Sequence, residues 1–460
     1  MLIFSIFILF IIIIKQFIMA NLADLQKHSL QLNPVNSISS GVYSPSSGLP
    51  LIKFDISSTE MPTSLDLSQL RISGNVTYKS GGAQVTATNA VFRDGFSGDI
   101  NNCIEHVTVS SKKLNSVLER VTNYSRMIPT IVSGQHGPSD INCQLWNEAG
   151  HCVNNFLARN VVVAQEAARG KSFCAPLYCG IFNSGGDLDI SQFGTGGLTI
   201  EILLKPNVSG AFGADAAGAN PVQYELSNLL LTCPALRATG MEAQSMIKAD
   251  RVFNFNSITS IFQTLNSAAA VVAVTPGLQN VSSVFMNAIN TQDLGNQLRN
   301  SARLSNMGQL RELRFSRNGV LHPNQYRLFS DVQQNNVVSA LNAQTLKGRE
   351  MVDKNYFEAL STNPIGQFGK TMVAYNNFED GIKNRAQTQN NGGSSVGTCS
   401  GAGVLFDAYG NGEDFSNTVF SAEFDNSTLD GTPASTLGLY LFFLNKQSLI
   451  MSPQGISVNK

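Results

Sequence analysis

Short runs that alternate apolar and polar residues recur along the chain, and they constrain its fold more than any other feature. LIKFDIS (51–57) and IEHVTVSS (104–111) alternate cleanly, and LDLSQLRISGNVTY (65–78) alternates with a change of phase near Gln69. A period of two places the apolar side chains on one face of a strand. These runs therefore predict half-buried strands, with a bulge or kink near Gln69.

The same alternation continues to the C-terminus. Further strands are predicted at 198–205, 222–232, 257–265, 268–275, 281–289, 310–316, 326–329, 418–424, 436–444 and 448–451. An NGVLHPNQ turn separates the strands at 310–316 and 326–329. So many short strands with turns between them are typical of a β-sandwich or barrel.

Helical periodicity is rarer and is clearest in KLNSVLERVTNYSRM (113–127). Its apolar residues recur at the three- and four-residue spacing of a single helical stripe, namely Leu114, Val117, Leu118, Val121 and Tyr124. We expect a helix here that ends before Pro129, because proline cannot continue one. Two more helices are predicted at 294–307 and 335–347.

The order of these segments indicates two similar blocks. The alternation is lost near residues 238–250, and each side carries short strands, a helix inserted after an early strand, and long loops. No repeat of 20–50 residues occurs, which excludes a solenoid or propeller. The predicted fold is all-β, with two consecutive jelly-roll β-sandwiches, short inserted helices and long loops. The predicted parts are a hydrophobic leader (1–18), an N-terminal arm (19–50), a first jelly roll (51–240) and a second (241–460).

Charge is scarce in this chain. Charged residues make up 14 % of it and the net charge is −1, whereas soluble domains average about 25 % charged residues. A neutral polar surface suits a protein that packs against its own copies, because few charges must be desolvated at the interface. No cluster of Lys and Arg is present, which argues against nucleic-acid binding, sequence-specific or otherwise.

The seven cysteines are irregularly spaced. Four of them, Cys143, Cys152, Cys174 and Cys179, lie close together in the sequence with His136 and His151 nearby. A zinc site is conceivable there, but structural zinc sites usually contain tight CxxC pairs and none occurs. The favoured interpretation is free thiols, several of them buried, with no metal.

Motifs for catalysis are missing. There is no GxSxG elbow and no HExxH motif, and we expect His106 to be a surface or half-buried strand residue. PIGQFGKT (364–371) ends like a phosphate-binding loop but has Pro364 where the first glycine is required. The glycine-rich stretch 390–403 is interpreted as a surface loop. The sequence therefore predicts no enzyme, no cofactor, and no catalytic, cofactor-binding or metal residue.

The apolar leader MLIFSIFILFIIIIKQFIM has three open interpretations. It could be a membrane-contacting segment, although its unbroken apolar part is shorter than the roughly 20 residues that span a bilayer. It could be a secretion signal, although no basic region precedes the apolar run. Translation could also begin at Met19, which would give a polar start. The five sequons are no more than a chain this rich in Asn, Ser and Thr produces by chance, so they do not argue for secretion.

Four stretches together resemble a known family. They are CIEHVTVSSKKLNSVLERVTNYSRM (103–127), LTIEILLKPN with VQYELSNLLLTC (198–207 and 222–233), ELRFSRNGVLHPNQYRL (312–328) and LGLYLFFLNKQSLIMSPQGISV (437–458). In this succession the chain resembles the double jelly-roll major capsid proteins of tailless icosahedral double-stranded DNA viruses. That lineage includes virophages, Polinton-like elements and the adenovirus hexon. The hydrophobic leader departs from it, since such proteins usually begin with a soluble arm.

The resemblance implies a structural protein of the virion, made and assembled inside the host cell. It implies homotrimeric capsomers of pseudo-hexameric outline that form an icosahedral shell. The implied partners are other copies of the chain, neighbouring capsomers and penton or minor capsid proteins, and the N-terminus is a candidate for contact with an internal membrane. The long loops 133–197 and 380–403 are implied to form outer towers or contacts between subunits.

A second function stays open at this point, that of a secreted or surface-anchored β-sandwich protein that binds a carbohydrate or protein ligand. It draws on the leader, the sequons and the single Trp146 in a long loop. One tryptophan is more often a packing residue than a sugar platform, since sugar sites commonly use several aromatic side chains.

Overall fold

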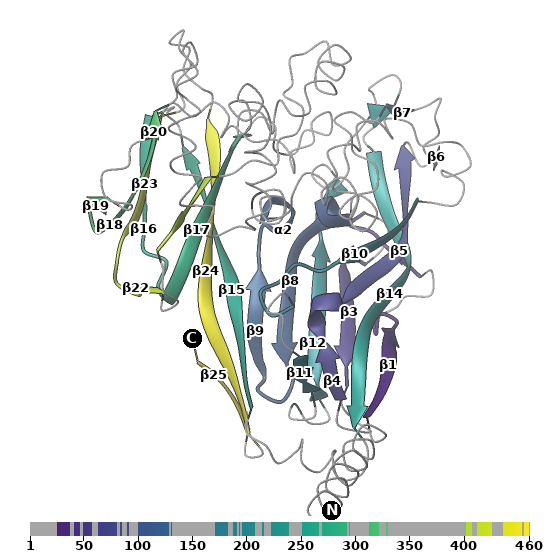
Figure 1. The fold of residues 1–460 in the computed structure, drawn as a ribbon. Coiled ribbons are helices and arrows are strands. Elements are labelled where there is room, and N and C mark those ends of the chain that lie inside the picture. Colours follow the sequence, from purple (N-terminus) through teal and green to yellow (C-terminus); the bar gives the residue numbers. More distant parts are fainter. Residues whose placement is uncertain are drawn as a thin grey trace, which may run out of the picture.

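The structure is a computed structural model of the 460-residue chain, and the residues that it describes are almost entirely in β-strands (Figure 1). It describes residues 25–36, 41–46, 49–57, 63–80, 83–84, 90–91, 100–127, 130, 171–182, 187–190, 193, 196–207, 214–215, 222–238, 251–265, 269–291, 294, 312–321, 328–329, 402–406, 412–425, 436–452 and 455–459. The predicted helix at 335–347, the one at 294–307 beyond its first residue, the leader and the boundary near 240 lie outside these residues.

The first sandwich pairs two antiparallel sheets. Sheet A contains β1 (Leu25–Leu32), β2 (Val42–Tyr43), β4 (Thr63–Asp66), β5 (Arg71–Ser80), β6 (Ala83–Gln84), β10 (Lys171–Pro176), β11 (Asp187–Asp189) and β14 (Val222–Ala238). Sheet B contains β3 (Leu51–Ile56), β12 (Leu198–Leu204), β8 (Ile104–Ser111) and β9 (Ser116–Val121). A separate short pair joins β7 (Ala90–Val91) to β13 (Ala214–Asp215).

The second sandwich also pairs two sheets. Sheet D contains β15 (Arg251–Leu265), β24 (Leu437–Ser452), β17 (Leu278–Asn290), β21 (Ala402–Leu405), β22 (Glu413–Phe415) and β25 (Gly455–Asn459). Sheet E contains β16 (Ala269–Val274), β23 (Phe420–Asp425), β18 (Glu312–Arg317), β19 (Val320–Leu321) and β20 (Leu328–Phe329).

Both sandwiches use one strand order. We number the main strands of each sandwich from first to eighth in chain order, and β4 with β5 counts as one broken strand. Across sheet A the order is then first (β1), eighth (β14), third (β4/β5) and sixth (β10/β11). Sheet B runs second, seventh, fourth, fifth, as β3, β12, β8, β9. Sheets D and E repeat these orders as β15, β24, β17, β21/β22 and β16, β23, β18, β19/β20. This shared order is that of an eight-stranded jelly roll, and it occurs twice in the chain.

The alternation of apolar and polar residues determines which face of each strand is buried. In β3, Ile52, Phe54 and Ile56 are buried while the residues between them are partly exposed. The predicted kink near Gln69 is confirmed, since a short 3₁₀ helix (Leu67–Gln69) separates β4 from β5. The predicted strands at 51–57, 104–111, 198–205, 222–232, 257–265, 268–275 and 281–289 are confirmed with small changes of boundary.

The predicted helix at 113–127 is wrong. Most of this segment is strand β9, which pairs with β8, and only Tyr124–Met127 form a short helix, α2. Leu118, Glu119 and Val121 are buried, whereas Val117 is 48 % exposed. Backbone pairing with β8 outweighs the local helical spacing, and it places Glu119 opposite Val109 on the same face of the strand as Val121.

Three other expectations need correction. The long loop expected over 133–197 contains strands β10 and β11, which pair with β5 and β4 of sheet A. Residues 25–32, inside the predicted arm, are not a free extension, because they form the edge strand β1 of sheet A along β14. The predicted division into two strands, 436–444 and 448–451, is also wrong, because β24 runs unbroken through both and Asn445 and Gln447 are buried. The last hairpin instead joins β24 to β25 through residues 453–454.

Candidate functional site

The candidate site is the junction where the first sandwich meets sheet D of the second. In Figure 1, β9 lies beside β15 at the middle of the molecule, with α2 directly above. The buried residues of the first sandwich form one continuous apolar cluster with Ile258, Tyr440 and Phe442 of sheet D. The two sandwiches therefore share a core and are not joined by a linker alone.

Glu119 on β9 is the polar centre of this junction. Its carboxylate accepts hydrogen bonds from the backbone N–H groups of Gly180 (3.0 Å), Ile181 (2.8 Å) and Ile258 (3.0 Å). The first two donors belong to the first sandwich and the third to β15 of the second. One buried side chain thus fixes two segments that lie far apart in the sequence.

Burial also changes the acidity of this group. Removal from water raises the pKa of Glu119 to about 7, while the N–H donors and the Ser257 hydroxyl act in the opposite direction. Cys179 lies close by and is fully buried, and burial followed by the nearby carboxylate raises the pKa of its thiol. Cys179 consequently stays a neutral thiol beside Glu119.

The backbones of the two sandwiches approach closely at Gly180. A β-carbon at this position would lie 1.7 Å from the carbonyl oxygen of Asn256 and 2.8 Å from Oε1 of Glu119. Only glycine fits here, because any side chain would force β15 away from the first sandwich.

A second set of polar contacts follows α2. The guanidinium of Arg126, which is buried, donates to Oδ1 of Asn287 on β17 and lies 5.6 Å from the ring centre of Tyr440 on β24. Asn123 donates from Nδ2 to the Ser260 hydroxyl on β15 at 3.1 Å. The short helix and the residue before it therefore contact three strands of sheet D, which the periodicity of the sequence does not reveal.

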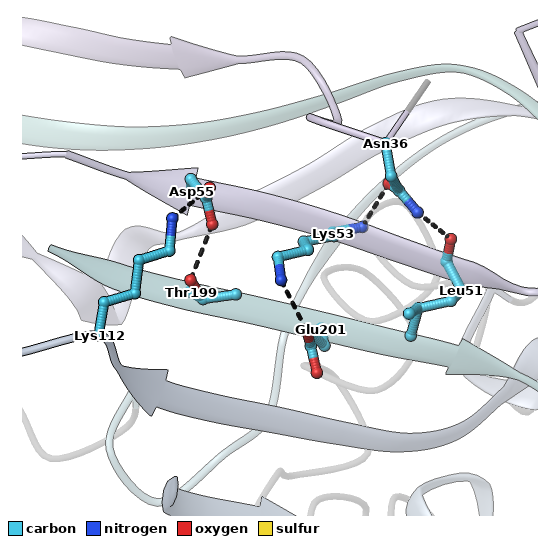
Figure 2. A network of polar contacts seen from close by, with 7 residues as sticks. All are labelled: Asn36, Leu51, Lys53, Asp55, Lys112, Thr199 and Glu201. Carbon is cyan, nitrogen blue, oxygen red and sulfur yellow. Dashed lines mark hydrogen bonds and ion pairs between the residues drawn. The ribbon is translucent and has the colours of Figure 1, made fainter. Parts of the chain in front are cut away.

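The opposite edge of sheet B is closed in another way, shown in Figure 2. The Asn36 side chain donates to the Leu51 carbonyl at 2.6 Å and accepts from the Lys53 N–H at 2.9 Å, as a neighbouring strand would. The backbone N–H of Val35 also donates to the Lys53 carbonyl at 2.8 Å. These contacts occupy backbone groups at the edge of β3 that could otherwise pair with another strand.

Ion pairs cover the outer face of sheet B (Figure 2). Lys53 pairs with Glu201 at 3.0 Å, and Lys112 pairs with Asp55 at 2.6 Å. Burial alone would raise the pKa of Asp55, but hydrogen bonds from Lys112 and Thr199 lower it below its ordinary value. All four charged side chains are partly exposed, so each pair contributes modestly to stability.

The residues considered for chemistry do not form a site. Of the cysteines that the structure describes, Cys103, Cys179 and Cys233 are buried and Cys174 is exposed. Cys143, Cys152, Cys399, His136, His151, His322, Trp146 and the segment 364–371 lie outside the described residues. His106 is half-buried on β8, as expected. Within the described ranges, no group of three or more His, Cys, Asp or Glu could hold a metal ion, and no helix could cross a membrane.

Comparison with solved structures gives the fold. VP54 of PBCV-1, fitted into a reconstruction of the virophage Sputnik, matches with a TM-score of 0.55 and 11 % identity over 95 % of this chain and 97 % of that one. A chain of the PBCV-1 virus capsid matches with a TM-score of 0.52 and 11 % identity over the same shares. A chain of the Sputnik virophage matches with a TM-score of 0.50 and 10 % identity over 94 % and 88 %.

The chain has the fold of these viral capsid proteins. The match spans both sandwiches, so the double jelly roll expected from the succession of strands is confirmed. No protein-family model matches the sequence, and no curated protein matches it. At about one identical residue in ten, the likeness establishes how the chain folds.

Proposed function

We propose that this protein is a structural major capsid protein, whose copies assemble into trimeric capsomers of pseudo-hexameric outline within an icosahedral shell. The observation that carries the proposal is the pair of jelly rolls with one strand order in one chain, matched over nearly its full length by chains of viral capsids. Three copies of a two-sandwich subunit supply six similar sandwiches, which is the number a hexagonal outline requires.

The junction supports this role. A subunit that acts as a building block must hold its two sandwiches at a fixed angle. The shared apolar cluster, the Glu119 hydrogen bonds and the Arg126–Asn287 contact provide such rigidity. A low content of charged residues, 14 %, lowers the desolvation cost when neighbouring subunits meet.

The proposed partners are other copies of the chain, neighbouring capsomers, and penton or minor capsid proteins, with the virion as the proposed location. We assign residues 51–240 to the first jelly roll and 241–460 to the second, with β1 from the segment 19–50 added to sheet A. For residues 1–18 we propose two alternatives: contact with an internal membrane, or a translation start at Met19 that leaves them out. The function of a secreted or surface-anchored binding protein is not favoured by the structural matches.

The test is the mass in solution of the protein beginning at Met19, measured by size exclusion with light scattering. We expect a stable trimer, and particles of hexagonal outline by negative-stain electron microscopy. A protein that stays monomeric at high concentration would overturn the proposal.

A further inference from the structure

The second strand of each sandwich lies at the edge of its sheet, and the two edges differ. In the first sandwich, Val35 and Asn36 form hydrogen bonds with backbone groups along the edge of β3. In the second sandwich β16 takes the place of β3, and within the described residues it pairs with β23 alone. In Figure 1 sheet E lies on the side of the second sandwich that faces away from the first, so the junction does not cover β16.

The connections between the first and second strands account for this difference. Residues 33–50 connect β1 to β3, which is long enough for the chain to run back along β3 before it enters that strand. β15 ends at Leu265 and β16 begins at Ala269, so only residues 266–268 connect the corresponding strands. Three residues reach about 10 Å at most. They are too few to join the two strands and also to cover the edge of β16.

β16 contains none of the features that usually keep an exposed edge from pairing. Natural edge strands are very short, or they contain lysine, proline or a bulge. β16 has the sequence AAVVAV without charge or proline, and its register with β23 is unbroken. Val271 is 64 % exposed and Ala273 is also exposed, whereas Val272 is buried. The strand therefore has one face in the core, an uncharged outer face and an edge to which a further strand can add.

The other edge strands that the structure describes are better protected. β10 begins at Lys171 and ends at Pro176, β1 contains Lys27, and β25 is followed at once by Lys460. β9 and β15 meet at the junction between the sandwiches. Others have only two to four residues, namely β2, β6, β7, β11, β13, β19, β20, β21 and β22. Among the described edges, β16 is thus the one best suited to accept a strand.

The sequence of β16 fits a second copy of itself. Two antiparallel copies with Val272 opposite Val272 place Val271 of each copy opposite Ala273 of the other, and Ala270 opposite Val274. Opposite residues of an antiparallel pair lie on the same face, so Val272 stays on the core side in both copies. Each alanine then lies opposite a valine, which lets the two backbones approach without a steric clash.

The charges on the outer face of sheet E also permit this pairing. Glu423 of β23 lies next to Val271, with Arg314 of β18 beyond it. In the second copy the same row continues through Ala273 and Ser421, which are uncharged. Glutamates of the two copies therefore do not share a row, and like charges do not oppose the contact.

We propose that β16 of one copy pairs antiparallel with β16 of a second copy about a local two-fold axis, so that sheet E continues across the contact. The inference rests on the proposed capsomer function, which places many copies of the chain side by side. Main-chain hydrogen bonds supply the attraction, as in other cases of strand addition. The contact is isologous, so each copy joins one neighbour through this edge and one trimer is linked to the next. The first sandwich cannot make the same contact, because Val35 and Asn36 occupy the edge of β3.

The test places lysines on β16 of the purified protein. Val271→Lys combined with Ala273→Lys puts lysines directly opposite lysines in the paired strands, which destabilises a sheet. Val320→Lys is the control, since Val320 is 66 % exposed on β19 at the other edge of sheet E. In light scattering, trimers of the unsubstituted protein and of the control should associate reversibly as their concentration rises. The β16 variant should keep the mass of a trimer, and circular dichroism checks that it is folded.

An exchange of charge tests the register. Val271→Glu combined with Ala273→Glu places glutamates opposite one another, so this variant should also stay trimeric when it is alone. An equal mixture with the lysine variant places each lysine opposite a glutamate and should restore association. A mixture that fails to associate would overturn the pairing of Val271 with Ala273.

Hydrogen exchange followed by mass spectrometry reports on the backbone itself. Exchange over residues 269–275 should be slower in associated trimers than in isolated ones, because edge amides gain partners. Association without slower exchange there would overturn strand pairing. Slower exchange in assembled particles, without association of purified trimers, would mean that a strand of another protein occupies the edge, and would overturn pairing with a second copy.

The remaining outcomes separate this inference from the proposed function. Trimers that associate equally well with and without lysines on β16 would overturn the inference and leave the capsomer intact. A protein that forms only dimers, and loses them with the β16 lysines, would support the strand pairing and overturn the trimeric capsomer. Trimers that show no association at any concentration would count against the β16 contact alone.

Discussion

Single residues decide how firmly the two sandwiches are held, and Glu119 is the clearest case. Its buried carboxylate is satisfied by N–H donors from both sandwiches. Buried donors that lose their acceptor cost about 1–3 kcal/mol each, more than an exposed ion pair contributes. Glu119 therefore matters more to the fold than the four partly exposed charges on sheet B.

Glu119→Ala should destabilise the protein by about 3 kcal/mol or more, because three buried N–H groups lose their acceptor. The measurement is urea unfolding followed by intrinsic fluorescence. Glu201→Ala is the control, since it removes the partly exposed Lys53–Glu201 pair and should cost less than about 1 kcal/mol. Equal losses for the two variants would contradict the role of Glu119.

The raised pKa of Glu119 predicts a pH dependence. A carboxyl group with a native pKa of about 7 and an ordinary value of 4.5 holds its proton more tightly in the folded state. Its contribution to stability is fully present below about pH 4.5 and is lost as the pH rises through 7. Glu119→Gln lacks this titration, so the stability difference between unsubstituted protein and variant should fall from pH 5 to pH 8. A difference that is constant with pH would refute this.

At the scale of elements, close backbone approach and closed sheet edges set the arrangement. Gly180 brings the loop after β10 against β15, and Asn36 completes the edge of β3. Both features depend on a small or a polar residue, and the pattern of hydrophobic residues in the sequence gives no sign of either. Each can be tested with one substitution.

Gly180→Ala should loosen the junction, because the new methyl group would lie 1.7 Å from a backbone oxygen of β15. Gly277→Ala is the matched control, since Gly277 has φ +69° and a β-carbon added there would meet no atom within 4 Å, so that only local strain is added. We expect the larger fall in melting temperature for Gly180→Ala. Faster hydrogen exchange in β15 should accompany that variant alone.

Asn36→Ala should open the edge of β3 to pairing with other chains, since two backbone groups lose their side-chain partner. We expect a loss of about 1–2 kcal/mol and faster aggregation on warming, followed by static light scattering. Asn254→Ala, which removes only an exposed hydrogen bond to Ser448, should leave both properties nearly unchanged.

At the scale of the whole molecule, one strand order used twice gives a subunit with two similar sandwiches. If copies of the chain assemble into capsomers, capsomer formation should depend little on salt, because only 14 % of the residues are charged. Trimer stability that falls steeply between about 50 mM and about 500 mM NaCl would instead indicate an electrostatic contact.

Local patterns were enough to establish most strands, the double sandwich and the lack of a recognisable catalytic motif. Alternation of apolar and polar residues is a local property of the sequence, so it is enough to predict strands β3, β8 and β12. Long-range packing was needed to show that 116–121 is a strand, that Asn445 and Gln447 are buried inside β24, and that Glu119 joins the two sandwiches. Each of these depends on contacts with a distant part of the chain, and no local pattern contains the residues that make them.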